Sequence, residues 1–129
     1  MAQIKIFGLG SELDPIKSLL SDAIHDCVID ALALPLDKRF HRFFSLDADN
    51  FVFPNDRSPR YTIIEISMFE GRSVETKKRL IALLFSRLHQ DLGLAPNDVE
   101  ITITETPRAN WGIRGQPGDE LGLTYSVNV

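Results

Sequence analysis

The feature that most constrains the fold of this chain is a strand-helix-strand pattern that occurs twice, in residues 3–46 and again in residues 61–106. A strand, a helix and a returning strand favour parallel pairing with a right-handed crossover. Two such units can join into one four-stranded mixed sheet with both helices on one face. We therefore predict an α/β fold, an α+β sandwich of tandem β-α-β units, as a single domain over residues 1–129.

Local signals set the elements of the first half. Apolar residues alternate at the N-terminus, and either Ser11 or Asp14 can cap the helix that follows. Its apolar residues recur at a spacing of three and four until Leu34 and Pro35 end it. The aromatic-rich segment 40–46 is predicted to be the returning strand.

The second half carries stronger signals of the same kind. Residues 61–69 are β-branched and apolar, and Ser73 is placed to cap the second helix. Gly93 suits a left-handed C-terminal cap. Residues 99–104 alternate strictly between apolar and polar, which predicts a strand with one buried face.

The sheet face away from the helices is expected to be mixed in character and to form a subunit contact. We predict a homo-oligomer, with residues 107–129 as an oligomerisation tail whose short final strand, 124–127, docks on the sheet edge of a neighbouring subunit. The residues expected on this face are Ile63, Glu65, Ser67, Phe69, Glu100, Thr102 and Thr104.

Composition excludes several classes of protein. The net charge of -4 argues against a nucleic-acid surface, and the basic run Lys77-Lys78-Arg79 is expected to be a solvated helix face. The apolar runs are too short to span a bilayer, and we expect no membrane partner and a cytoplasmic location. The single Cys27 is expected to be a buried, inert thiol.

Arg72 is the residue around which chemistry is expected. It follows the second half's first strand and precedes its helix, where a cation opposes the helix dipole but a bound carboxylate would satisfy both the guanidinium and the free backbone donors. The alternative is a surface ion pair with Glu70 or Glu75. Trp111 either walls a pocket or packs in the core. The three histidines lie in separate elements without metal spacing, and we expect neither a metal nor a cofactor.

With the tandem halves, the Gly71-Arg72-Ser73 motif and Trp111, the chain resembles the tautomerase superfamily, most closely its malonate semialdehyde decarboxylase-like branch. The resemblance implies a tautomerase/MIF-like fold, a homotrimer and pockets near subunit contacts. It also implies an N-terminal proline as acid or base, and arginines that bind the carboxylate of a small oxo or enol acid. Arg72 and Trp111 match the second arginine and the pocket tryptophan of this branch.

Other family positions carry different residues here. The alignment on Phe7 places Gln3 at the proline position, with Met1 and Ala2 as an extension. Glu70 stands at the first arginine. Counted from the end of the first helix, the catalytic aspartate of the branch falls on Lys38, and Asp37 fits after a slip of one residue; Lys38 and the adjacent Arg39 are predicted substrate-binding residues.

Removal of Met1 would expose Ala2 as a primary amine, and such amines titrate at about 7.7 to 8.0, which suits a base near neutral pH. The chain is therefore expected to be either of two things. One is a tautomerase-like isomerase with Ala2 and Arg72 as catalytic residues and Gln3 near the substrate. The other is a non-catalytic trimeric protein that binds a carboxylate or serves as a scaffold.

Overall fold

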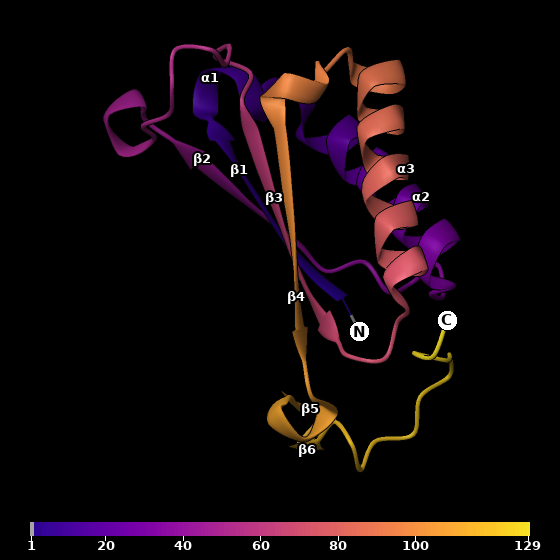
Figure 1. Cartoon of the computed structure of the whole chain (residues 1–129). Coiled ribbons are helices and arrows are strands. Elements are labelled where there is room, and N and C mark those ends of the chain that lie inside the picture. Colours follow the sequence, from indigo (N-terminus) through magenta and orange to yellow (C-terminus); the bar gives the residue numbers. More distant parts are fainter. Residues whose placement is uncertain (1) are drawn as a thin grey trace.

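The computed structural model describes residues 2–129. Its main part is a mixed sheet covered on one face by two long helices (Figure 1), and a small two-stranded sheet follows near the C-terminus. Short 3-10 turns connect several of these elements. The helices and strands are β1 (Ala2–Leu9), α1 (Gly10–Leu13), α2 (Lys17–Leu32), β2 (His41–Leu46), β3 (Thr62–Phe69), α3 (Val74–Leu92), β4 (Val99–Thr106), β5 (Gly112–Ile113) and β6 (Gln116–Pro117).

The strand order β2-β1-β3-β4 confirms the predicted four-stranded mixed sheet. β1 is parallel to β2 and β3 is parallel to β4, while β1 and β3 run antiparallel at the centre. Each parallel pair is joined through a helix, α2 or α3, and these two helices pack against each other on the same face (Figure 1). The alternating apolar residues of the sequence produce this arrangement, because every second residue of β1, from Ala2 to Gly8, points under the helices and is buried.

The helix ends follow local chemistry only in part. Ser73 caps α3 by accepting a hydrogen bond from Thr76 N–H, and Gly93 ends the helix in the left-handed conformation, both as predicted. At the first helical segment the prediction was wrong, because helical backbone starts at Gly10. Neither Ser11 nor Asp14 forms the expected side-chain cap at the starts of α1 and α2.

The outer sheet face is mixed in polarity, as expected, with one exception. Glu65, Thr102 and Thr104 are exposed there. Phe69 lies on the same side of β3 by alternation, yet it is 0% exposed, because the chain after β4 folds back over this end of the sheet. Long-range packing thus removes an aromatic residue from the surface that the sequence pattern assigned to a subunit contact.

Within residues 2–129, no helix is long and apolar enough to cross a membrane.

Candidate active site

Three strand ends meet beside the start of α3. Ala2 pairs with Met68, and Met68 pairs with Glu105, so that the beginning of β1 lies against the carboxyl ends of β3 and β4. Both chain ends are drawn at this end of the molecule (Figure 1). Ligands of open α/β sheets collect beyond the carboxyl ends of strands, which makes this end the place to look for a site.

Arg72 is buried at this end, between β3 and α3. The residue is 5% exposed, and its Nη1 donates a hydrogen bond of 3.1 Å to the carbonyl oxygen of Phe69. Its Nε and Nη2 are buried and find no hydrogen-bond partner among residues 2–129. We call Nε and Nη2 the open donors of Arg72. Burial lowers the pKa of this guanidinium, while the negative charge of Glu105 acts in the opposite direction.

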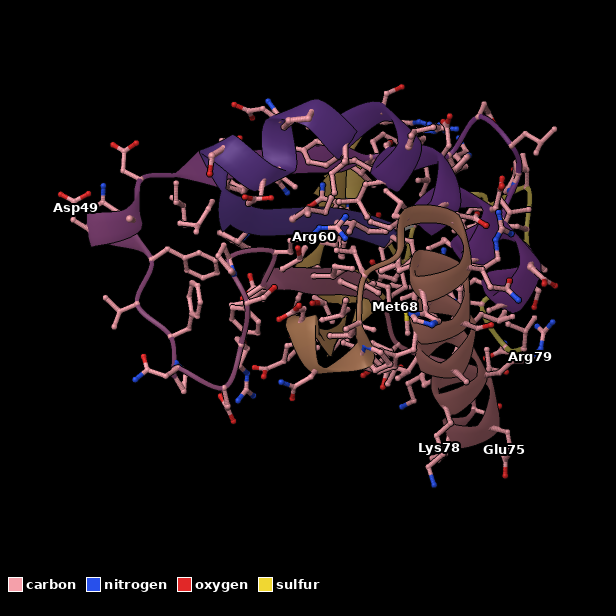
Figure 2. All side chains as sticks on the ribbon, turned by 90° about the horizontal axis from the view of Figure 1, so that it is seen from above. Asp49, Arg60, Met68, Glu75, Lys78 and Arg79 are labelled. Atoms are coloured by element: carbon pink, nitrogen blue, oxygen red, sulfur yellow. The ribbon has the colours of Figure 1, made fainter. Side chains whose placement is uncertain are left out.

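The surface ion pair that was the alternative role for Arg72 is not formed within the described part of the chain. Glu70 and Glu75 are exposed, and Figure 2 shows Glu75 directed away from the body of the molecule. A buried donor without an acceptor costs about 1–3 kcal/mol. The two open donors of Arg72 would therefore be stabilised by an acceptor that residues 2–129 do not supply.

The acid beside Arg72 is engaged elsewhere. Lys77 Nζ and Glu105 Oε1 are 2.6 Å apart, and the two side chains are only 26% and 25% exposed. The expectation of a fully solvated face over the basic run is therefore wrong for Lys77. It holds for Lys78 and Arg79, which are exposed.

The segment after β4 covers the site from the outer side. The Trp111 ring packs edge-on against Phe69 with centroids 5.0 Å apart. The guanidinium of Arg108 lies over the Phe69 ring, 5.6 Å from its centroid, and donates to the carbonyls of Gly118 and Leu121. Trp111 therefore has a packing role against Phe69.

The last residues pack on their own chain. Residues 124–127 form bends and irregular backbone, so the predicted final strand is not formed within the single chain, and its docking on a neighbouring subunit stays a prediction. Val127 packs on Phe69, and Ser73 N–H donates to the main-chain oxygen of Val129 over 3.1 Å, across the start of α3. We call residues 127–129 the strap. Sequence reasoning missed the strap because its contacts join residues more than fifty positions apart.

The N-terminal residues are placed differently from the prediction. Ala2 belongs to β1, with its side chain 3% exposed in the core, and is not an extension ahead of the strand; Met1 lies outside the described residues. Ala2 also lies next to Met68, close to the Arg72 region. Gln3 turns to the outer face, where its Oε1 accepts a hydrogen bond of 3.0 Å from Arg42 Nη2.

The remaining candidates do not gather around Arg72 in one chain. Arg39 bonds Asp22 over 2.7 Å and lines an open hollow of about 430 Å³ together with Gln3 and Arg42. Lys38 lines a separate hollow of about 60 Å³ against the tail segment 121–125. Within this chain Lys38 and Arg39 line different hollows, and Arg72 lines neither of them.

Two histidines that the sequence separates are brought together by the fold. The rings of His25 and His41 are 6.0 Å apart, and burial followed by the charge of its neighbours lowers the pKa of His41 to about 4. In residues 2–129 no group of three acidic, histidine or cysteine side chains is arranged to hold a metal ion. Burial raises the pKa of Cys27 to about 11, in keeping with an inert thiol.

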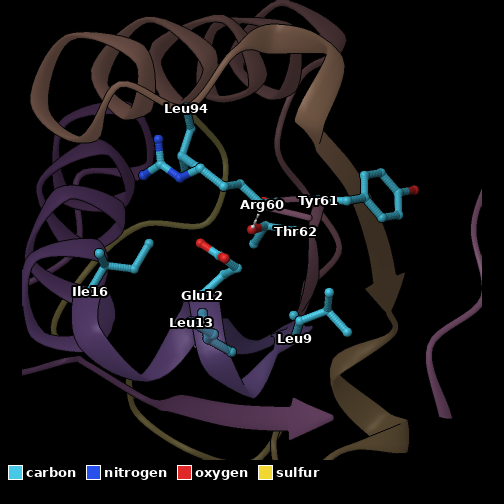
Figure 3. Close-up of a pocket in the computed structure, with 9 residues that line it drawn as sticks. Leu9, Glu12, Leu13, Ile16, Arg60, Tyr61, Thr62 and Leu94 are labelled. Atoms are coloured by element: carbon cyan, nitrogen blue, oxygen red, sulfur yellow. Dashed lines mark hydrogen bonds between the residues drawn. The ribbon is translucent and has the colours of Figure 1, made fainter. Parts of the chain in front are cut away.

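A further arginine lies at the opposite end of the sheet and has a structural role. Arg60 donates to the carbonyls of Leu92 and Gly93 at the end of α3. The carbonyl of Arg60 accepts a hydrogen bond from Thr62 Oγ1 (Figure 3). Glu12 points toward the same small pocket from α1. Arg60 satisfies the last carbonyls of a helix, which is a common role for a cation at that position.

Comparison with known proteins identifies the family. The sequence model described as tautomerase enzyme matches residues 38–114. A 2-hydroxymuconate tautomerase of Comamonas testosteroni is 40% identical over 58 residues, which are 45% of this chain and 92% of that protein. The probable tautomerase YrdN of Bacillus subtilis is 23% identical over 107 residues, covering 79% of this chain and 81% of its own length. The chain belongs to the tautomerase family.

Solved structures agree with this assignment. A malonate semialdehyde decarboxylase inhibited by 3-bromopropiolate is 28% identical, with a TM-score of 0.80 over 94% of this chain and 98% of its own. A native fused 4-OT gives a TM-score of 0.83 at 21% identity, over 94% and 99% of the two chains, and shows the shared fold. The predicted superfamily and its tautomerase-like fold are therefore confirmed.

Proposed function

We propose that this chain is a tautomerase-like isomerase that converts the enol and keto forms of a small 2-oxo carboxylic acid. The observation that supports this most is Arg72, a guanidinium 5% exposed whose open donors lie at the start of α3. A carboxylate can accept two hydrogen bonds from such a group and also gains from the positive end of the helix dipole. Trp111, through its contact with Phe69, borders the substrate.

The reaction needs one proton to leave the enol oxygen and one to be added at carbon 3, without any redox change. We propose the amine of Ala2, after removal of Met1, as the group that carries this proton. Its position beside Met68 supports the assignment, because Met68 immediately precedes the residue that holds Arg72. Substrate reaches Arg72 in this scheme when the strap moves from the start of α3, where Val129 accepts from Ser73.

We further propose that the protein acts as a cytoplasmic homotrimer. Phe7 and Phe44 stack on the outer sheet face with centroids 4.7 Å apart, and Phe44 is 37% exposed, as expected of a surface that another subunit covers. A fused 4-OT with the same fold, 19% identical, is described as an asymmetric trimer. In an assembly of this kind Lys38, Arg39 and Gln3 would line the pocket from a neighbouring subunit. Light scattering that gives the mass of one chain would refute this part.

The second candidate function is a trimeric carboxylate-binding protein or scaffold without turnover. The sequence favours it in one respect, because the first proline of the chain is Pro15 and Gln3 stands where the family proline is expected. In this case Arg72 binds a carboxylate but no base acts on it.

Phenylenolpyruvate separates the two candidates. An isomerase accelerates its conversion to phenylpyruvate, and Arg72→Met removes the acceleration, whereas Arg79→Met, on the exposed face of α3, leaves it intact. A binding protein gives no rate above buffer but is stabilised thermally by phenylpyruvate in an Arg72-dependent manner. Intact-protein mass spectrometry that shows a retained or acetylated Met1 would eliminate Ala2 as the base. Absence of both turnover and stabilisation would refute both candidates.

A further inference from the structure

The Lys77–Glu105 ion pair lies beside Arg72, and we infer that Lys77 is a positioning residue that holds Glu105 off Arg72, which keeps the open donors available to a substrate carboxylate. This inference rests on the proposed role of Arg72 as the carboxylate-binding group. It assigns a task to a lysine that the sequence pattern places on a solvated helix face.

The geometry brings the three side chains together from three elements. Glu105 of β4 is the register partner of Met68, the residue before Phe69, whose carbonyl holds Arg72 Nη1. Lys77 reaches the same place from the end of the first turn of α3, and its Nζ is 2.6 Å from Glu105 Oε1. Glu105 is close enough to raise the pKa of Arg72 against the effect of burial. Its hydrogen bond nevertheless goes to the lysine.

Chemical preference makes this arrangement informative. A guanidinium binds a carboxylate through two parallel hydrogen bonds, which is stronger and more directional than the contact of an ammonium group. With Lys77 absent, we expect Glu105 to turn toward the buried, under-satisfied Arg72. An internal carboxylate at an effective concentration of roughly millimolar or higher would then compete with the substrate.

Other charges near α3 do not explain the pairing. Glu70 and Glu75 are exposed, and Lys78 points to solvent on the outer side of the helix (Figure 2). Lys78→Met is therefore a matched control for Lys77→Met, since it removes the same charge from the same helix and leaves the partner of Glu105 in place.

The test uses the full chain and two readouts in wild type, Lys77→Met, Glu105→Gln, the double variant and Lys78→Met. The first readout is the nitrogen-15 NMR resonance of Arg72 Nε–H in the ligand-free protein, assigned by its loss in Arg72→Met. The second is the dissociation constant of phenylpyruvate from calorimetry, accompanied by KM and kcat for phenylenolpyruvate if the protein turns it over. We expect Lys77→Met to shift the resonance and to weaken binding about tenfold, a change of about 1.4 kcal/mol, with kcat unchanged.

The double variant provides the decisive comparison. Removal of the Glu105 charge should return both the resonance and the dissociation constant of Lys77→Met to within twofold of wild type, and Lys78→Met should behave as wild type. An unshifted resonance in Lys77→Met, wild-type binding by that variant, or a double variant that stays weak would overturn the inference while leaving Arg72 as the binding group. If wild type itself does not bind phenylpyruvate, the proposed function fails, and the role of Lys77 fails with it. A fall in kcat for Glu105→Gln would make Glu105 a catalytic group and also contradict the positioning role.

Discussion

Replacement of Arg72 by methionine should make the protein more stable while it loses its ligand. Each of the two open donors carries a desolvation cost of about 1–3 kcal/mol, which methionine removes. The substitution gives up the single 3.1 Å bond to Phe69, and a hydrogen bond from a charged group contributes about 1.5–3 kcal/mol. Replacement of a whole buried ion pair by apolar side chains of similar volume is often neutral or stabilising by about 1–4 kcal/mol, which sets the scale for a buried charge that has no ion-pair partner. We therefore expect the free energy of unfolding to rise by about 1–3 kcal/mol.

Urea denaturation followed by circular dichroism, at a fixed protein concentration, measures this change. Arg79→Met is the matched control, because it removes the same guanidinium from α3, seven residues after Arg72, where the side chain is 53% exposed in an ion pair with Asp30. Its effect should stay within about 0.5 kcal/mol. Phenylpyruvate at a hundred times its dissociation constant should add about 2.7 kcal/mol to wild type and nothing to Arg72→Met. A loss of stability above about 1 kcal/mol in Arg72→Met would show that the arginine is structural, and would refute the reasoning from its open donors.

Three further predictions concern the surroundings of the site. Ser73→Ala should lower the free energy of unfolding by about 1 kcal/mol through loss of the α3 cap, as measured in urea, whereas Ser86→Ala on the exposed face of the helix should not. His41, with its pKa lowered to about 4, should make the protein less stable as pH falls from about 6.5 toward 4, because the unfolded state binds the proton first; His41→Gln should flatten thermal stability over that window, and an unchanged slope would contradict the shift. Gly118→Ala would bring a Cβ within 2.8 Å of the Arg108 carbonyl oxygen and should loosen the packing of the tail over Phe69, which acrylamide quenching of the single tryptophan would detect as easier quenching. Gly122→Ala is the control, because its Cβ would meet nothing within 4 Å. Equal quenching in both variants would argue against the close contact at Gly118.

The sheet and its two helices were predictable because their signals are local and periodic. Alternation in residues 99–104 and the three-and-four spacing of α2 and α3 each report one buried face, and a strand-helix-strand order permits few topologies. The start of the first helical segment was mispredicted because a local signal was present in the sequence but is not used in the structure. Two good capping residues stood near Gly10, but strand β1 runs directly into the helix there, and the backbone needs no side-chain cap to turn.

The cover over the site was not predictable from these signals. Phe69 obeys the alternation of β3, yet whether the outer side of its ring meets water or Trp111 depends on a return of the chain about forty residues later. The tail contains short apolar stretches between glycines, and this pattern resembles that of a weak strand. In the structure, single residues such as Val127 fill gaps instead. Contacts of this kind have no period to detect.

Arg72 shows where a local rule stops being sufficient. The helix dipole identifies a cation immediately before the start of a helix as anomalous, and that rule works on sequence alone. The dipole rule does not distinguish a guanidinium that pairs with Glu70 or Glu75 from one that is free to bind a ligand. The distinction depends on burial and on Glu105, which lies 33 positions from Arg72 in the sequence and is engaged by Lys77 at 2.6 Å. A cation becomes a candidate binding group when two conditions are met: the fold buries it, and its nearest acidic group is paired with another residue. Lys77 matters to the site because it meets the second condition, by pairing with Glu105.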